Sequence, residues 1–185
     1  MPEAELLTAA SAGEAAERIR EAQRDRASLL ACGRRTRLAR HAPAAAPDRW
    51  LSLSAMDRLL EFDAEDQTCV VEPGLAPEAL DQAAAEHGLE LGVLAPAGGS
   101  LGGLFLSPDL SLLSGYFGPP RDQVLGADWL LADGTAVRTG ARVVKSVAGY
   151  DLTRLFLGSR GRLAVCTRLV LRLRPRPRRP SWCLG

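Results

Sequence analysis

The sequence predicts an α+β fold in which a small α/β part precedes a larger, mainly antiparallel part. A capped helix and short apolar strands fill the first third of the chain. An Asp-Gly hairpin and a long alternating strand fill the second half. The length of 185 residues and the 46% hydrophobic content are typical of a globular domain that folds without a metal or disulfide.

The first part begins with a helix and continues as strands. A capping box at residues 11–14 predicts a helix over about 12–25. A short buried strand is expected at 28–32, before a polar stretch that runs to Arg49. The alternation at 50–54 predicts a second strand, and 56–62 and 68–71 are expected to form a turn and another strand.

The second part combines one helix with antiparallel strands. Pro77 to His87 is expected to form a helix that Gly88 ends. Asp133-Gly134 predicts a hairpin between strands at 129–132 and 135–138. A short helix is expected over 151–157, and alternation over 163–173 predicts a strand.

Composition excludes several classes of site. The four cysteines are far apart and the chain has only two histidines, so no metal site is expected. The acidic N-terminus predicts no signal peptide, and residues 91–108, although uncharged, contain five glycines, so no transmembrane segment is expected either. These features predict a cytoplasmic protein.

Charge leaves one question open. The net charge of +1 argues against a dedicated nucleic-acid binder. The last 34 residues nevertheless hold nine arginines and no acid. A solvated strand face with a frayed tail is the favoured interpretation, ahead of docking on an acidic subunit surface or a basic patch that binds nucleic acid or an anionic membrane.

Two segments are candidates for ligand binding. Gly98-Gly99-Ser100-Leu101-Gly102-Gly103 would let backbone N–H groups approach a phosphate or ring, although a plain packing turn is an equal alternative. Lys145 is the single lysine beside 22 arginines, which suggests a site for a compact ammonium group. A surface lysine is the alternative.

Longer motifs in the same region resemble a known family. The block from Lys145 to Leu163 is similar to the K-x-V-A-G-Y-D-L-T-x-L-x-x-G-S-x-G-x-L block of FAD-linked oxidases of the vanillyl-alcohol oxidase type, with a PCMH-type FAD-binding domain. Val71-Glu72-Pro73-Gly74, Leu101-Gly102-Gly103 and the segment 118–126 match in family order. Within the family, the closest resemblance is to the FAD-binding E subunit of glycolate oxidase.

The resemblance implies FAD bound non-covalently between two subdomains. These would be a small parallel α/β subdomain at 1–67 and a larger, mainly antiparallel sheet subdomain with helices at 68–175, followed by a basic Pro-rich tail at 176–185 and no cap domain. The implied cofactor-binding residues are Cys32, Gly33, Arg34, Arg35, Thr36, Arg37, Gly98, Gly99, Ser100, Leu101, Gly102, Gly103, Asp122, Lys145, Gly149, Tyr150, Asp151, Leu163, Ala164 and Val165. The diphosphate would rest on the loops 32–37 and 98–103, and no catalytic residue is implied.

Two functions remain as hypotheses. The resemblance implies a subunit of a glycolate-oxidase-like complex that oxidises a 2-hydroxy acid by hydride transfer to flavin and is inactive alone. Its partners would be a larger FAD-containing subunit and an iron–sulfur subunit, through which the chain could be peripheral to a membrane. The alternative is a cofactor-free assembly or regulatory subunit in which Arg34, Arg35 and Phe105 fill the flavin cleft, because this chain departs from the family's glycines there.

Overall fold

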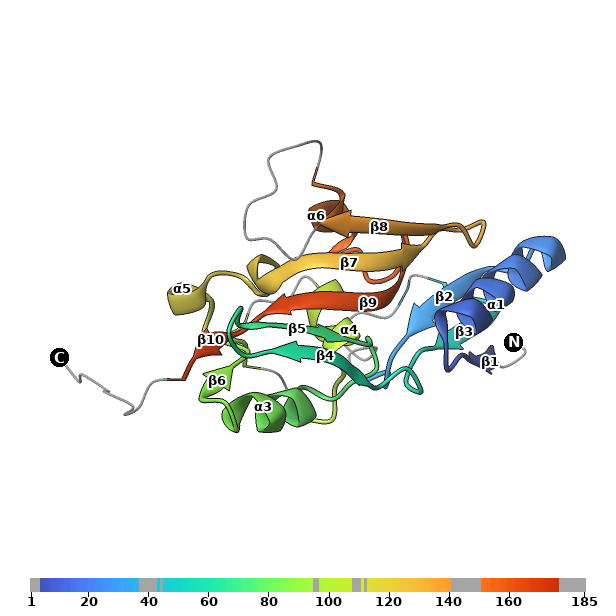
Figure 1. The fold of residues 1–185 in the computed structure, drawn as a ribbon. Helices are drawn as coiled ribbons and strands as arrows, with labels where there is room; N and C mark the ends of the chain where they lie inside the picture. Colours follow the sequence, from blue (N-terminus) through green and yellow to red (C-terminus); the bar gives the residue numbers. More distant parts are fainter. Residues whose placement is uncertain are drawn as a thin grey trace.

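The computed structural model describes residues 4–36, 43, 45–94, 97–107, 111, 113–140 and 151–176. They form two lobes that lie side by side (Figure 1). The small lobe is α/β and the large lobe is built on an antiparallel sheet, as the sequence predicts.

The small lobe is a parallel three-stranded sheet with one helix. The strands β1 (Glu5–Thr8), β3 (Arg49–Ser52) and β2 (Leu29–Cys32) lie in the order β1-β3-β2, and both ladders are parallel. Helix α1 (Ala12–Asp25) begins at Ser11, whose side chain accepts from the Glu14 N–H. Its buried face, which includes Ala15 and Ile19, packs in one cluster with Leu51 of β3. The capping box thus places the helix where it was predicted.

The large lobe is a five-stranded antiparallel sheet in the order β4-β5-β9-β7-β8. Its strands are β4 (Leu59–Asp63), β5 (Thr68–Val71), β7 (Val124–Leu130), β8 (Ala136–Gly140) and β9 (Val165–Arg172). A second ladder joins β6 (Leu89–Glu90) to β10 (Arg174–Pro175). The helical segments are α3 (Pro77–Ala85), α4 (Leu101–Leu106), α5 (Ser114–Phe117), the 3₁₀ turn η1 (Pro120–Gln123) and α6 (Leu152–Phe156).

The core of the large lobe lies between the sheet and its helices. Trp129 of β7 and Leu169 of β9 are fully buried with Leu80 of α3 and Phe105 of α4. The Trp129 indole N–H donates to Thr139 Oγ1 at 2.8 Å, and the Thr153 hydroxyl of α6 donates to the same oxygen. This buried chain of hydrogen bonds fixes α6 to the edge of the sheet.

The lobes share contacts at the end of the sheet. Leu130 and Val165 of the large lobe pack in the same cluster as α1 and β3. Arg20 of α1 donates to the Gly134 carbonyl in the β7–β8 turn at 3.1 Å. The two lobes are therefore joined by packing as well as by the chain.

Several elements differ from the sequence prediction, and β4, β1 and α4 are the ones that bear on the site. The segment 56–62 was expected to form a turn, but it contains the first four residues of strand β4. Because β4 pairs with β5, it belongs to the sheet of the large lobe, although the expected first subdomain extended to residue 67. Strand β1 and helix α4 were not predicted. Helix α4 contains two glycines and has little intrinsic propensity, so burial of Leu104 and Phe105 and the Ser100 cap stabilise it instead.

Candidate functional site

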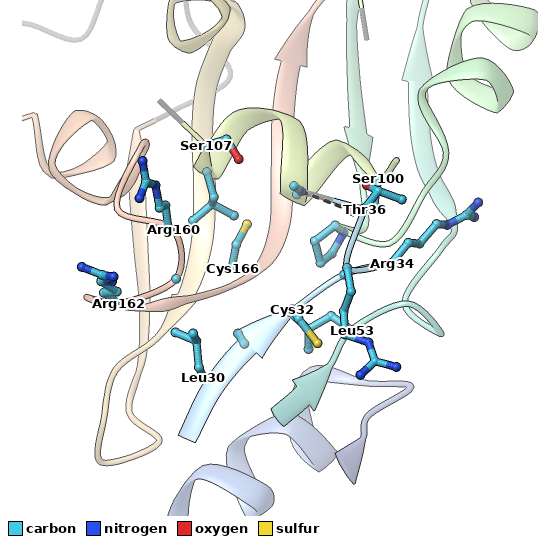
Figure 2. A pocket seen from close by; sticks show the side chains of 18 of the residues that line it. Leu30, Cys32, Arg34, Thr36, Leu53, Ser100, Ser107, Arg160, Arg162 and Cys166 are labelled. Atoms are coloured by element: carbon cyan, nitrogen blue, oxygen red, sulfur yellow. Dashed lines mark hydrogen bonds between the residues drawn. The ribbon is translucent and has the colours of Figure 1, made fainter. Parts of the chain in front are cut away.

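A pocket opens between the two lobes (Figure 2). The empty space within it is about 910 Å³, a figure that includes space open to solvent. Its walls come from both lobes, including the glycine-rich segment 98–103 and the turn 160–162 before β9. The lining residues are Leu30, Ala31, Cys32, Gly33, Arg34, Arg35, Thr36, Pro43, Leu53, Pro73, Ser100, Gly102, Gly103, Leu106, Ser107, Arg160, Gly161, Arg162 and Cys166.

The loop 33–36 follows the carboxyl end of β2 and forms one wall. Within the described part of the chain, the backbone N–H groups of its four residues donate to no acceptor. Arg35 has a φ of 57°, in the left-handed region that favours glycine. Successive free N–H groups beside a left-handed residue make a concave anion-binding surface. The loop therefore offers main-chain donors for a phosphate.

Ser100 stands against this loop and caps helix α4. Its hydroxyl accepts from the Gly103 N–H at 3.3 Å. A Cβ added to Gly33 would collide with the same hydroxyl. Glycine at position 33 thus lets the two loops approach closely.

Of the two roles that the sequence left open for this glycine segment, ligand approach and packing, Gly102 of α4 has the packing role. The N–H groups of Leu101 and Gly102 donate to the Leu75 and Pro73 carbonyls at 2.9 and 2.7 Å, so they are not free for a ligand. A Cβ on Gly102 would lie 2.8 Å from the Pro73 Cβ. Gly102 therefore permits close packing of α4 on the segment that leads out of β5.

Gly74 in that segment is enclosed by the small lobe. A Cβ there would collide with the Leu53 carbonyl and lie 2.7 Å from that of Met56. The Gly74 N–H donates to the Met56 carbonyl at 2.7 Å. Pro73 and Gly74 thus hold the floor of the pocket between the lobes.

The turn 160–162 forms the opposite wall. Arg160 has a φ of 58° and Gly161 a φ of 72°, and the Arg160 N–H donates to the Leu106 carbonyl at 2.9 Å. Figure 2 shows Arg160 and Arg162 on one side of the pocket and Arg34 on the other. This turn is left-handed at two successive residues, and the bond to α4 holds it in place.

Positive charge dominates the pocket. Its described lining holds four arginines, at 34, 35, 160 and 162, and no aspartate or glutamate. None of these guanidinium groups forms an ion pair with another residue in the described ranges. Cationic groups without partners in a concave site concentrate anions there.

The pocket thiols remain protonated at neutral pH. Burial raises the pKa of Cys32, and the nearby Arg35 lowers it in part. Burial raises the pKa of Cys166 to about 12. Across the residues that the structure describes, no group of three or more His, Cys, Asp or Glu side chains could hold a metal ion. The described donors therefore favour an anionic organic ligand.

Eight of the residues implied by the resemblance line this pocket. They are Cys32, Gly33, Arg34, Arg35, Thr36, Ser100, Gly102 and Gly103. Leu163, Ala164 and Val165 line a neighbouring groove beside α1, and Gly161 and Arg162 border both spaces. Gly98, Gly99, Leu101, Asp122 and Asp151 do not line the pocket. Arg37, Lys145, Gly149 and Tyr150 lie outside the described residues.

Asp122 and Asp151 both contact Arg154 of α6. Asp122 lies 3.5 Å from the Arg154 guanidinium, and Asp151 lies 3.0 Å from it. The Asp151 side chain also accepts from the Arg154 N–H and caps α6. Asp122 therefore links η1 to α6, whereas Asp151 stabilises the first turn of α6 itself.

Several lining residues were not among the implied set. Arg160, Gly161 and Ser107 are examples. The motif Gly158-Ser159-Arg160-Gly161 carried a signal for the turn, since both glycines have positive φ. No local sequence pattern predicts that Ser107 lines the pocket, because only the folded chain brings the end of α4 close to the turn 160–162.

The pocket fits a dinucleotide. Arg34 and Arg35 are exposed at its edge, and Phe105 is buried in the core with 2% of its surface exposed. The hypothesis of a filled cleft placed Phe105 in the flavin cleft, and the structure places it in the core of the large lobe instead. The free N–H groups at 33–36 and the uncompensated positive charge suit a diphosphate.

Comparison with protein families supports this chemistry. Residues 4–140 match the family model described as an FAD binding domain. The chain is 37% identical over 127 residues to a mitochondrial D-lactate dehydrogenase [cytochrome] of Arabidopsis thaliana, covering 69% of this chain and 22% of the relative. It is 36% identical over 127 residues to glycolate oxidase subunit GlcD of Bacillus subtilis, covering 66% and 26%.

The fold has solved counterparts as well. A structure of alkyldihydroxyacetonephosphate synthase superposes with a TM-score of 0.79 at 17% identity, covering 94% of this chain and 32% of that one. The chain spans about a quarter of the length of the curated relatives that it matches. Among the described residues, no helix is long and apolar enough to cross a bilayer.

Proposed function

The chain belongs to the FAD-binding domain family, and we propose that it holds FAD non-covalently in the pocket between its lobes and acts in the oxidation of a 2-hydroxy acid. The observation that carries this proposal is the loop 33–36, where free N–H groups and two arginines meet on one wall of that pocket. The named relatives support the substrate class, since glycolate and lactate are both 2-hydroxy acids.

Different lining residues would bind different parts of the cofactor. The N–H groups of Gly33 to Thr36 would donate to the diphosphate, and the Arg34 and Arg35 side chains would neutralise its charge. The apolar lining at Leu30, Leu53 and Pro73 would exclude water from the less polar parts of the dinucleotide. Bound FAD supplies the electron-accepting chemistry for oxidation of the hydroxyl carbon.

The described residues that line the pocket include no general base. Its described lining has no carboxylate or histidine to take the proton of the substrate hydroxyl. We therefore propose that it works as a subunit resembling the E subunit of glycolate oxidase, inactive by itself. A larger FAD-containing subunit and an iron–sulfur subunit would be its partners, in the cytoplasm or at a membrane surface through them.

A visible spectrum tests the cofactor proposal. Chain reconstituted with FAD and freed of excess cofactor should show flavin bands near about 375 and 450 nm. Acid or heat should release unmodified FAD, because no covalent link is expected. Colourless protein after reconstitution would contradict the proposal.

The variant Arg34→Ala/Arg35→Ala tests the phosphate loop. We expect FAD affinity to fall by about tenfold or more, since charge-assisted hydrogen bonds contribute about 1.5–3 kcal/mol each. Arg24→Ala/Arg172→Ala is the control, because it removes two arginines that do not line the pocket. An unchanged affinity in the loop variant would show that FAD binds elsewhere.

A further inference from the structure

The turn of the β7–β8 hairpin, in the large lobe, rests on helix α1 of the small lobe. Figure 1 shows this turn beside the helix. Gly134 of the turn is buried, although Asp133 and Thr135 on either side of it are exposed. A hairpin turn usually lies on the surface, with its backbone open to water. The burial of this one glycine therefore reflects its cover by α1.

Arg20 of α1 makes the polar contact with the turn. Its Nη2 donates to the Gly134 carbonyl at 3.1 Å. A Cβ on Gly134 would lie 2.9 Å from the Arg20 Nε and 3.1 Å from the Ala16 carbonyl oxygen, so the turn backbone lies directly against the helix. The Asp133 side chain accepts from the Thr135 N–H at 2.8 Å and closes the turn. This hairpin contact, Arg20 with Gly134, thus joins a helix to a well-defined turn of the other lobe.

The hairpin contact is separate from the place where the chain crosses between the lobes. The crossing is the segment 53–58, between β3 and β4, and there Gly74 packs against Leu53, beside Pro73 of the pocket lining. The hairpin contact lies beyond the turn 160–162, because the groove beside α1 borders both that turn and the end of β7. Two bodies joined at one place can rotate about it, and a second contact fixes their angle.

We propose that Arg20 is a positioning residue for the FAD pocket, which through the Gly134 carbonyl holds the two lobes at the angle at which both contact one FAD molecule. This inference rests on the proposed function, because that function assigns the pocket to FAD. Without the hairpin contact the lobes sample other angles, and FAD binds only the fraction of chains at the competent angle. The apparent affinity then falls, although neither Arg20 nor Gly134 lines the pocket.

Fluorescence titration of FAD into Arg20 variants tests the role of the guanidinium. Arg20→Ala should bind FAD about threefold more weakly or more, because a hydrogen bond between the lobes is lost. Arg20→Lys keeps a cationic donor on a long side chain and should recover part of that affinity. Arg24→Ala, which removes an exposed arginine from the next turn of α1, should stay within about twofold of the parent. All titrations use a temperature at which circular dichroism shows each protein fully folded, so that unfolding does not contribute.

Two glycine variants separate loss of the hairpin contact from backbone strain. Gly134 and Gly88 both have left-handed backbone, with φ of 77° and 68°, so alanine strains either position. A Cβ on Gly88 would meet nothing within 4 Å, whereas one on Gly134 would push against α1. Gly134→Ala should therefore weaken FAD binding by about threefold or more, and Gly88→Ala should leave it within about twofold of the parent.

NMR residual dipolar couplings of the cofactor-free chain measure the angle between the lobes directly. One alignment tensor should fit both lobes of the parent, and Arg20→Ala should require a separate tensor for each lobe. A residue that merely stabilised α1 would change the free energy of unfolding and leave the single tensor intact. Two tensors in the parent, or one tensor in Arg20→Ala, would overturn the positioning role.

The outcomes separate this inference from the proposed function. Parent chain that binds no FAD would contradict the proposed function and, with it, this inference. Parent chain that binds FAD, with unchanged affinity in both Arg20→Ala and Gly134→Ala, would contradict only the positioning role.

Discussion

Single residues in the phosphate loop decide how this chain can hold a diphosphate. The family usually has glycines here, and this chain has Arg34 and Arg35. The backbone nevertheless turns through the left-handed region at Arg35, where a side chain is unfavourable. The loop therefore keeps its main-chain donors and gains cationic side chains, at the expense of local strain.

Replacing Arg35 separates the effect of its charge on FAD binding from the effect of its left-handed backbone on stability. Arg35→Gly and Arg35→Ala both remove the charge, but only glycine relieves the left-handed backbone. We expect the glycine variant to be more stable than the alanine variant by about 1 kcal/mol, measured by urea unfolding of cofactor-free chain. Both variants should bind FAD more weakly than the parent. Equal stability would mean that the loop is unstrained at this residue.

Gly33 controls the distance between the two loops. Gly33→Ala should lower FAD affinity, because its Cβ would collide with the Ser100 hydroxyl. Ser100→Ala alone should lower stability by about 0.5–2 kcal/mol through loss of the α4 cap.

The double variant gives the coupling between these residues. In Gly33→Ala/Ser100→Ala the collision with the hydroxyl is absent, so part of the lost FAD affinity should return. Fluorescence titration of FAD into each of the four proteins measures this. Strictly additive losses would contradict direct contact between positions 33 and 100.

At the scale of elements, the segment after β5 connects the pocket to the sheet. Glu72 has 4% of its surface exposed, and its carboxylate accepts from the Arg58 N–H and guanidinium at 2.8–3.1 Å. Pro73 follows and lines the pocket, and Gly74 packs against Leu53 and Met56 of the small lobe. The hydrogen bonds from Arg58 to Glu72 therefore fix the chain directly after β5, where Pro73 lines the pocket.

This ion pair predicts a pH dependence of stability. The hydrogen bonds from Arg58 lower the pKa of Glu72 below its ordinary value. The ionised Glu72 carboxylate therefore contributes to the free energy of unfolding. This contribution is complete above the unfolded pKa of about 4.3 and is lost as pH falls through the lower folded pKa. Glu72→Gln should cost about 1–3 kcal/mol at pH 7.

Urea unfolding at pH 7 and at pH 3 measures this. The stability difference between parent and Glu72→Gln should shrink at the lower pH, because protonation removes the charge from the parent as well. Glu65→Gln is a control, since Glu65 is exposed and takes no part in the hydrogen bonds of Glu72. A difference that stays constant with pH would contradict the assignment to Glu72.

Elements also differ in how far the sequence predicts them. Helix α1 follows from its capping box, and the β7–β8 hairpin follows from Asp133-Gly134, because both signals act within a few residues. Strand β4 pairs through a bulge that interrupts its alternation, and α4 depends on tertiary burial. No local sequence pattern therefore predicts β4 or α4.

For the whole molecule, two lobes packed around a shared pocket form one folding unit. The small lobe shares a cluster with Leu130 and Val165 of the large lobe. The interior of the large lobe contains two thiols, Cys69 and Cys166, whose pKa values burial raises to about 12. Exposure of either thiol therefore requires opening of the main sheet.

These thiols predict loss of stability in alkali. Their folded pKa values exceed the unfolded value of about 8.5, so their contribution is complete below that pH and is lost as pH rises towards 12. Each thiol should add about 1.4 kcal/mol per pH unit to the decline over that window. Urea unfolding at pH 8, 9 and 10 should give a shallower decline for Cys69→Ala/Cys166→Ala, and an identical slope would contradict the assignment.

The sequence by itself determined the two-part α+β order, the capped helix, the hairpin and the family, and it predicted the loop proposed to hold the phosphates. Caps, turns and alternation act over neighbouring residues, and motifs survive in linear order. Only the tertiary structure decided that Phe105 packs in the core, that Gly102 packs against Pro73, and that the turn 160–162 lies across the pocket from the loop 33–36. The direction in which a side chain or a missing Cβ points depends on segments distant in the chain, and no local pattern encodes those contacts.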